Sequence, residues 1–134
     1  MRLFIFSLAV LATACAANSQ HRWNATSCAG RAGRDSIVYD TTQVAERPAL
    51  RTSPPILYPG RPHDEGIQGR VIMALIINAD GTVDSQSVVV VHRVHPELDA
   101  AAVRWVRSAL YWPACVEGQS VRVRVLVPVE FTNR

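Results

Sequence analysis

The feature that most constrains this fold is an uninterrupted apolar run at residues 71–77, within the stretch GRVIMALIINADG at residues 69–81. Half-buried strands alternate apolar and polar residues, so a continuous run predicts a strand covered on both faces. A buried helix is the alternative, but three Ile and one Val in the run are β-branched, which favours a pleated strand. We therefore predict a central strand here, with the rest of the domain packed around it.

A turn ends this run, and a second apolar run follows. Asn78-Ala79-Asp80-Gly81 contains Asp-Gly, which supplies the positive-φ positions of a tight hairpin turn. Consecutive valines at residues 88–91 form the second run. The sequence therefore predicts a β-hairpin whose first strand is the central one.

A helix is predicted after the hairpin. Pro96 suits the first helical position, and Glu97 and Asp99 suit the positive N-terminal end of a helix. One apolar stripe has helical spacing and comprises Leu98, Ala102, Trp105, Ala109 and Trp112. Pro113 is expected to end this helix.

The last strand is predicted at residues 121–131, where apolar and mainly polar positions alternate. Pro128 has no N–H to donate to a ladder, so we expect this strand to lie at an edge of the sheet. The order strand, strand, helix, strand predicts an α+β fold, in which one helix packs on a small antiparallel three-stranded sheet.

Residues 1–17 predict an export signal. A positive start precedes an apolar core at residues 3–14, which is too short to span a bilayer. Ala14-Cys15-Ala16 fits an ordinary signal-peptidase site, whereas Ala12-Thr13-Ala14-Cys15 resembles a lipobox that would lipidate Cys15. Both routes export the protein, and the choice between them stays open.

Residues 18–54 are mostly polar and predict a tether that leads to a domain at residues 55–134. A short strand at residues 36–39 is the one element expected within it. After either cleavage, Cys28 and Cys115 are the free thiols that remain, and an exported pair can form a disulfide. Two unpaired thiols are the alternative, because the sequence gives no distance between them.

The sequence offers no catalytic constellation. It has no Ser elbow, no Gly-rich phosphate loop and no Cys-x-x-Cys motif. His92 and His95 are only two ligand-type side chains, and a metal site needs three or four. The 14 basic residues, all Arg, are scattered without the interleaved aromatic residues of a nucleic-acid-binding face. We therefore predict no catalytic residue, metal, cofactor or nucleic-acid partner.

Several short motifs follow one another along residues 58–131, and their order and spacing are informative. They are Tyr58-Pro59, Gly66-Ile67-Gln68-Gly69-Arg70-Val71, Asp80-Gly81-Thr82-Val83, Pro96-Glu97-Leu98-Asp99-Ala100-Ala101-Ala102, Trp112-Pro113-Ala114, Glu117-Gly118-Gln119 and Val127-Pro128-Val129 with Phe131. In this order and spacing, residues 58–131 resemble the C-terminal domain of the TonB family.

The resemblance implies a periplasmic domain of a Gram-negative cell. Such a domain binds a TonB-box-like segment of an outer-membrane transporter by adding it as a strand, a mode that exposed strand edges permit. In the family the last strand is the acceptor, and the segment before the first strand lies near the contact. The contacts implied for this chain are Arg122, Val123, Arg124 and Val125 on the last strand, with Tyr58, Pro59 and Gln68 upstream.

The chain also departs from the family pattern. A full energy transducer retains an N-terminal membrane helix and a long Pro-rich spacer, whereas this chain has a short apolar run and no strong Pro repeat. Two hypotheses follow: a TonB-type binding module in TonB-dependent transport, or a stand-alone periplasmic adaptor or structural lipoprotein without energy transduction. A lipid anchor through Cys15 and a homodimer are further states that the sequence leaves open.

Overall fold

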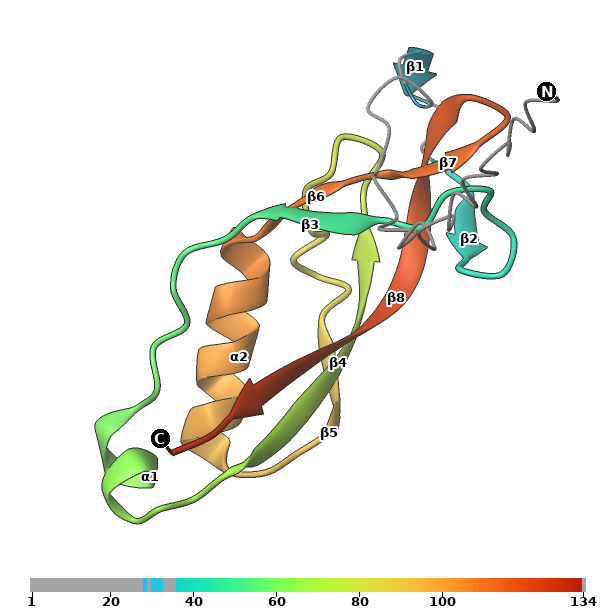
Figure 1. Ribbon diagram of the computed structural model, residues 1–134. Helices are drawn as coiled ribbons and strands as arrows, with labels where there is room; N and C mark the ends of the chain where they lie inside the picture. The colour runs from blue at the N-terminus through green and yellow to red at the C-terminus, as the bar shows by residue number, and fades with distance from the viewer. Residues whose placement is uncertain (1–27, 29, 33–35, 134) are drawn as a thin grey trace, which may run out of the picture.

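The computed structural model describes residues 28, 30–32 and 36–133, so the predicted export signal and Cys15 lie outside the described residues. The fold is α+β, as predicted: helix α2 (Pro96–Ser108) lies across one face of a twisted sheet (Figure 1). None of the described helices is both long and apolar enough to cross a membrane.

Strand β4 (Gly69–Ile77) is the central strand, which confirms the first prediction. It pairs antiparallel with β8 (Gln119–Phe131) along its whole length, from Gly69↔Phe131 to Ile77↔Val123. On its other side it pairs with β5 (Val89–His92), the second valine run.

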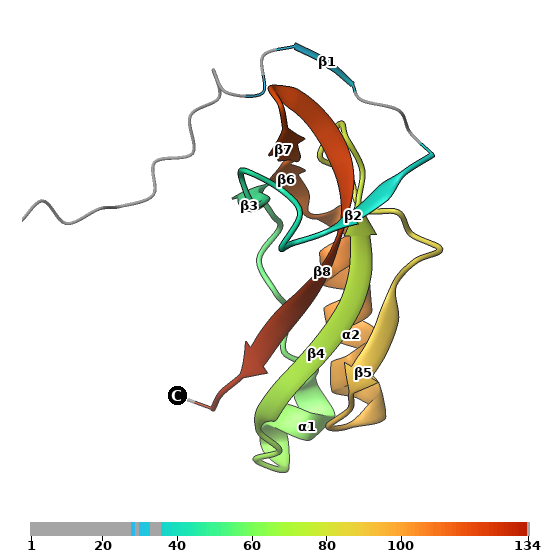
Figure 2. The same ribbon diagram turned by 90° about the vertical axis from the view of Figure 1, so that its right-hand side faces the viewer.

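The two faces of β4 are covered differently. Its inward residues are buried under α2, while the outward ones are only partly buried; the inward row is Val71, Met73, Leu75 and Ile77. The prediction that both faces are covered is therefore wrong, because helix α2 packs on one side of the sheet (Figure 2). The apolar residues of the outward row are Ile72, Ala74 and Ile76.

The hairpin connection is longer than predicted. The Asp-Gly turn does form, with the Gly81 N–H donating to the Asn78 carbonyl at 2.9 Å and Gly81 at φ +88°. One bridge, Ile77↔Val83, continues the ladder. A second turn then interrupts it, in which the Ser87 N–H donates to the Asp84 carbonyl at 3.0 Å, and β5 begins only at Val89.

Helix α2 begins at Pro96 as predicted, and the His95 side chain accepts a hydrogen bond from the Glu97 N–H. It ends at Ser108, so the prediction of a helix reaching Pro113 is wrong. Residues 110–112 instead form strand β6 (Leu110–Trp112), because the Tyr111 N–H donates to the Gly81 carbonyl at 2.8 Å and β6 pairs with an upstream strand. The apolar residues of α2 that are buried against the sheet are Leu98, Ala101, Ala102 and Val106.

Further strands extend the sheet to six strands and form a separate two-stranded sheet of β3 and β6. Strand β7 (Ala114–Val116) forms a hairpin with β8 through Glu117-Gly118, both at positive φ. The segment predicted as a tether contributes β1 (Gly30–Ala32), β2 (Val38–Asp40) and β3 (Ala49–Thr52), of which β2 overlaps the short strand predicted at residues 36–39. The first two pair in parallel with β8, and β3 pairs antiparallel with β6.

The chain between β3 and β4 runs beside α2 (Figure 1). The Trp105 indole N–H donates to the Pro54 carbonyl at 2.9 Å, which fixes this extended stretch to the helix. A short helix that the sequence did not predict, α1 (Gly60–Asp64), then precedes β4, and its Pro62 is buried.

Candidate functional site

Strand β8 has two edges, and its outer edge changes character halfway along. The inner edge pairs with β4 from Val123 to Phe131. On the outer edge β2 pairs with residues 122–124. Before them, β1 and β7 both pair with Gln119 and Ser120, so these two strands flank the start of β8 on opposite edges. Among the described residues no strand pairs with the outer edge of residues 125–131. Backbone groups on that stretch therefore have no ladder partner.

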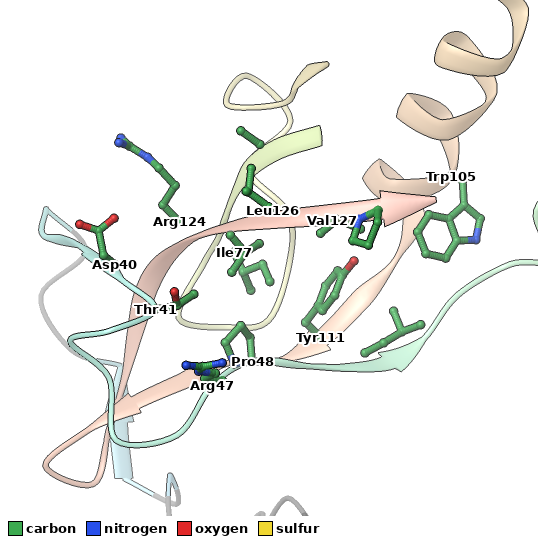
Figure 3. A pocket seen from close by; sticks show the side chains of 14 residues that line it. Asp40, Thr41, Arg47, Pro48, Ile77, Trp105, Tyr111, Arg124, Leu126 and Val127 are labelled. Carbon is green, nitrogen blue, oxygen red and sulfur yellow. The ribbon is translucent and has the colours of Figure 1, made fainter. Parts of the chain in front are cut away.

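A groove of about 670 Å³ runs along this open stretch. On one side lies β8, and on the other lie β3 and β6, with Trp105 at one end of the site (Figure 3). Its apolar lining includes Pro48, Leu50, Ile77, Trp105, Tyr111, Val125 and Val127.

The inward row of β8 explains why a groove exists here. Val123 at one end and Val129 and Phe131 at the other are buried. Val125 and Val127, between them, pack against the core but stay partly exposed. An apolar row that is uncovered in the middle of an open edge suits an extended chain, which would pair with the backbone and place alternate side chains in the groove.

Charge is concentrated at one end of the groove. Arg47 and Arg124 line it there together with Asp40, and both arginine side chains are exposed. Figure 3 shows these three side chains on the side away from Trp105. An acidic side chain of an incoming segment would find complementary charge at this end.

The predicted contacts on β8 have different surroundings. Arg124 and Val125 line the groove. Val123 is fully buried in the core. Arg122 donates from Nε to the Asn78 side-chain oxygen at 3.1 Å and from Nη2 to an Asp84 carboxylate oxygen at 2.8 Å. Its guanidinium therefore holds the turn after β4 in place.

The upstream predicted contacts lie at the opposite end of β8. The Tyr58 ring packs edge-on against Phe131, with 5.4 Å between ring centroids, and its hydroxyl donates to the Ile67 carbonyl. Pro59 precedes helix α1, and Gln68 is exposed just before Gly69, the partner of Phe131. The structure therefore does not bring Tyr58, Pro59 and Gln68 together with Arg122–Val125.

Sequence reasoning missed most of the groove. Arg47, Pro48 and Leu50 come from the segment predicted as a tether, and Tyr111 was placed in the helix. Trp105 packs against the core, as its place in the middle of the predicted apolar stripe indicates, and it is also partly exposed beside the groove. The pairing of β3 with β6 leaves no pattern in the sequence that could have predicted the opposite side of the groove.

Two groups at the turn after β4 have shifted pKa values, and each shift has a structural cause. The Thr82 hydroxyl and N–H both donate to the Asp80 carboxylate, and these bonds hold the pKa of Asp80 below its usual value. Burial raises the pKa of Tyr111, which lies against the same turn. Within the part of the chain that the structure describes, no cluster of three or more His, Cys, Asp and Glu side chains could hold a metal ion.

Cys28 and Cys115 are joined as a disulfide, with their Cα atoms 5.8 Å apart. This separation is within the range that a disulfide requires. Cys115 belongs to β7, so the bridge attaches the N-terminal segment beside the start of β8. That the exported protein carries this bridge stays a prediction.

The geometry defines this protein as an α+β domain in which helix α2 packs on a sheet and part of the outer edge of β8 is open. The model of the family described as Gram-negative bacterial TonB protein C-terminal matches residues 54–132, and the chain belongs to this family. The predicted resemblance is thereby confirmed.

Two TonB C-terminal domains are among the solved structures that are similar to this chain. The C-terminal domain of Pseudomonas aeruginosa TonB is 19% identical, with 74% of this chain and 99% of that chain covered and a TM-score of 0.48. The C-terminal domain of Helicobacter pylori TonB is 26% identical, with 59% and 72% covered and a TM-score of 0.41. No curated protein matches the chain.

Proposed function

We propose that this chain is a periplasmic TonB-like protein-binding module, which engages a TonB-box-like segment of an outer-membrane transporter by strand addition in TonB-dependent transport. The open outer edge of residues 125–131, beside an apolar groove, is the observation that carries this proposal. Membership of the TonB C-terminal family supports it. The role is binding rather than catalysis.

In this mode the backbone supplies most of the affinity. The unpaired N–H and C=O groups of residues 125–131 would form a ladder with the incoming segment. Alternate side chains of that segment would lie in the groove against Leu50 and Tyr111. Arg47 and Arg124 would favour an acidic residue at one end, and a segment that follows β8 to Phe131 would reach Tyr58, Pro59 and Gln68.

Peptides with N-methylated amides test strand addition without altering the protein. The probes are synthetic peptides from periplasmic segments of outer-membrane transporters of the same cell, each methylated at one backbone nitrogen. Because ladder bonds alternate along a strand, methylation should weaken binding strongly at every second position and little between. A flat response, with affinity following only the peptide side chains, would mean that the partner docks elsewhere.

A charge-reversal pair tests the acidic preference. Arg124→Glu should weaken binding of an acidic peptide, mainly through a slower association rate, because exposed charges act on encounter. Arg104→Glu is the matched control, since Arg104 is also exposed but lies on α2 outside this groove. Equal losses in the two variants would show that net charge, and not the groove, governs the association.

Where the protein is located depends on how residues 1–17 are processed. We infer that the chain is exported, and that its N-terminus is cleaved or, through Cys15, lipidated. Intact mass spectrometry of the protein from native membranes should show a processed N-terminus, with added lipid mass if Cys15 is the anchor. Recovery of full-length chain with Met1 in the inner membrane would contradict processing. It would support a retained N-terminal membrane helix, as in a full energy transducer.

A further inference from the structure

One short segment of the chain is attached to Cys115 from two sides. Upstream, Cys28 is bonded to Cys115 as a disulfide. Downstream, the Ala45 N–H donates to the Cys115 carbonyl at 2.9 Å, and the Cys115 N–H donates to the Glu46 carbonyl at 3.1 Å. Residues 36–46, the anchored segment, therefore lie in the sequence between the disulfide at Cys28 and the hydrogen bonds at Ala45 and Glu46.

The anchored segment lies on the outer edge of β8. Its strand β2 pairs in parallel, with Val38↔Arg122, Tyr39↔Val123 and Asp40↔Arg124. Figure 2 shows β2 beside β8 just before the stretch that stays open. The chain thus already performs strand addition on itself, on the same edge that the proposed function assigns to a partner.

Little burial holds β2 in place. None of its residues is buried: Val38 and Tyr39 are partly exposed and Asp40 is exposed. Tyr39 of β2 and Val44, further along the anchored segment, pack against the core and are partly buried. Such a short strand is marginal alone, but a covalent tie keeps the effective concentration of an intramolecular strand near millimolar. The disulfide therefore adds a covalent restraint upstream of β2 to the hydrogen bonds that hold Ala45 and Glu46 downstream of it.

We propose that the anchored segment is an intramolecular competitor, which covers residues 122–124 of the acceptor edge and is retained there by the Cys28–Cys115 bridge. This inference rests on the proposed function. When the disulfide is closed, a partner strand can pair only with the outer edge of residues 125–131. When the disulfide is open, the edge available for pairing begins at residue 122. Asp40 lies opposite Arg124 in the ladder, so the partner segment that replaces β2 is extended and acidic at this position.

Opening the bridge requires a dithiol reductant. Cys28 is partly exposed and Cys115 is buried, so the thiolate of the reductant attacks the sulfur of Cys28 and the Cys115 thiolate leaves. The second thiol of the reductant then resolves the mixed disulfide. Two electrons and two protons pass to the chain, which ends with two thiols while the reductant ends as a disulfide.

Amide hydrogen exchange on the full chain tests whether β2 covers the edge. Val38→Pro removes a β2 residue from the ladder, and Ser36→Pro, just before the strand, is the matched control. Outer-edge amides of residues 122–124 should exchange about tenfold faster, relative to β4 amides, in Val38→Pro and after reduction with dithiothreitol. Ser36→Pro should match the parent. Unchanged protection at residues 122–124 in both the variant and the reduced protein would refute the proposal.

The footprint of an acidic transporter peptide separates this inference from the proposed function. In the oxidised parent the peptide should protect outer-edge amides of residues 125–131 only. In Val38→Pro and in the reduced protein protection should begin at residue 122, with affinity about tenfold higher. Equal footprints and affinities in all forms would leave the proposed function standing and remove the competitor. A peptide that protects no part of β8 would remove both.

Discussion

The outer edge of β8 has two parts, which are covered differently by the rest of the chain. Residues 122–124, the covered half, pair with β2, whereas residues 125–131, the open half, have no outer strand partner among the described residues. The inner edge pairs with β4 from Val123 to Phe131. What differs is the outer partner: the covered half lies against a short strand with no buried residue, whereas the open half is held by β4 and by the packing of Val129 and Phe131 in the core.

Phe131→Ala should have the largest effect and should act on the open half. Phe131 is 2% exposed and packs against Tyr58 at the end of β8. Truncating a buried Phe costs roughly 3–5 kcal/mol of unfolding free energy. Chemical denaturation measures this loss, with Thr132→Ala at the exposed neighbouring position as the control. A loss below about 1 kcal/mol would mean that the end of β8 is not anchored by the core.

Cys28→Ser should have the next largest effect and should act on the covered half. The bridge joins residues with a sequence separation of 87, and closing so long a loop contributes about 4 kcal/mol in the chain-entropy model. Denaturation of the oxidised parent and the variant gives the difference. Peptide mapping without reductant must also recover the Cys28–Cys115 linkage in the exported protein; both cysteines recovered alkylated would contradict the bridge.

Trp105→Ala should have the smallest effect on stability and a clearer one on binding. The side chain is partly exposed and lines the groove, so its loss should cost less than the roughly 3–5 kcal/mol of a buried Trp. Val106→Ala, at the adjacent buried position, is the control that should lose stability without losing contact with a peptide. If Trp105→Ala unfolds the protein while binding per folded molecule is unchanged, Trp105 belongs to the core and not to the groove.

The sequence predicted what depends on apolar patterning and turn chemistry. The run at residues 71–77, Pro96 and the alternation before Phe131 placed the central strand, the start of the helix and the last strand correctly. The end of the helix at Ser108 could not be predicted, because residues 109–112 continue an apolar stripe that tertiary pairing with β3 converts into a strand. Local propensity is overridden there by a partner far away in sequence.

The candidate site was predicted only in part for the same reason. The alternation on β8 identified the acceptor strand of the proposed function, including Arg124 and Val125 beside the groove. It could not show that Arg122 is bound to Asp84, or that β2 pairs with residues 122–124. These features depend on non-local contacts made by polar segments, which leave no period in the sequence.

Site-specific cross-linking tests most directly that the open half of β8 is the acceptor. The sheet has a second free edge at β5, so Leu126→Cys on β8 is compared with Val91→Cys on β5, both at exposed positions. The probe is a transporter peptide with a single activated Cys. We expect a disulfide with Leu126→Cys and none with Val91→Cys under the same conditions. A cross-link at Val91→Cys without one at Leu126→Cys would contradict the account and assign the partner to β5.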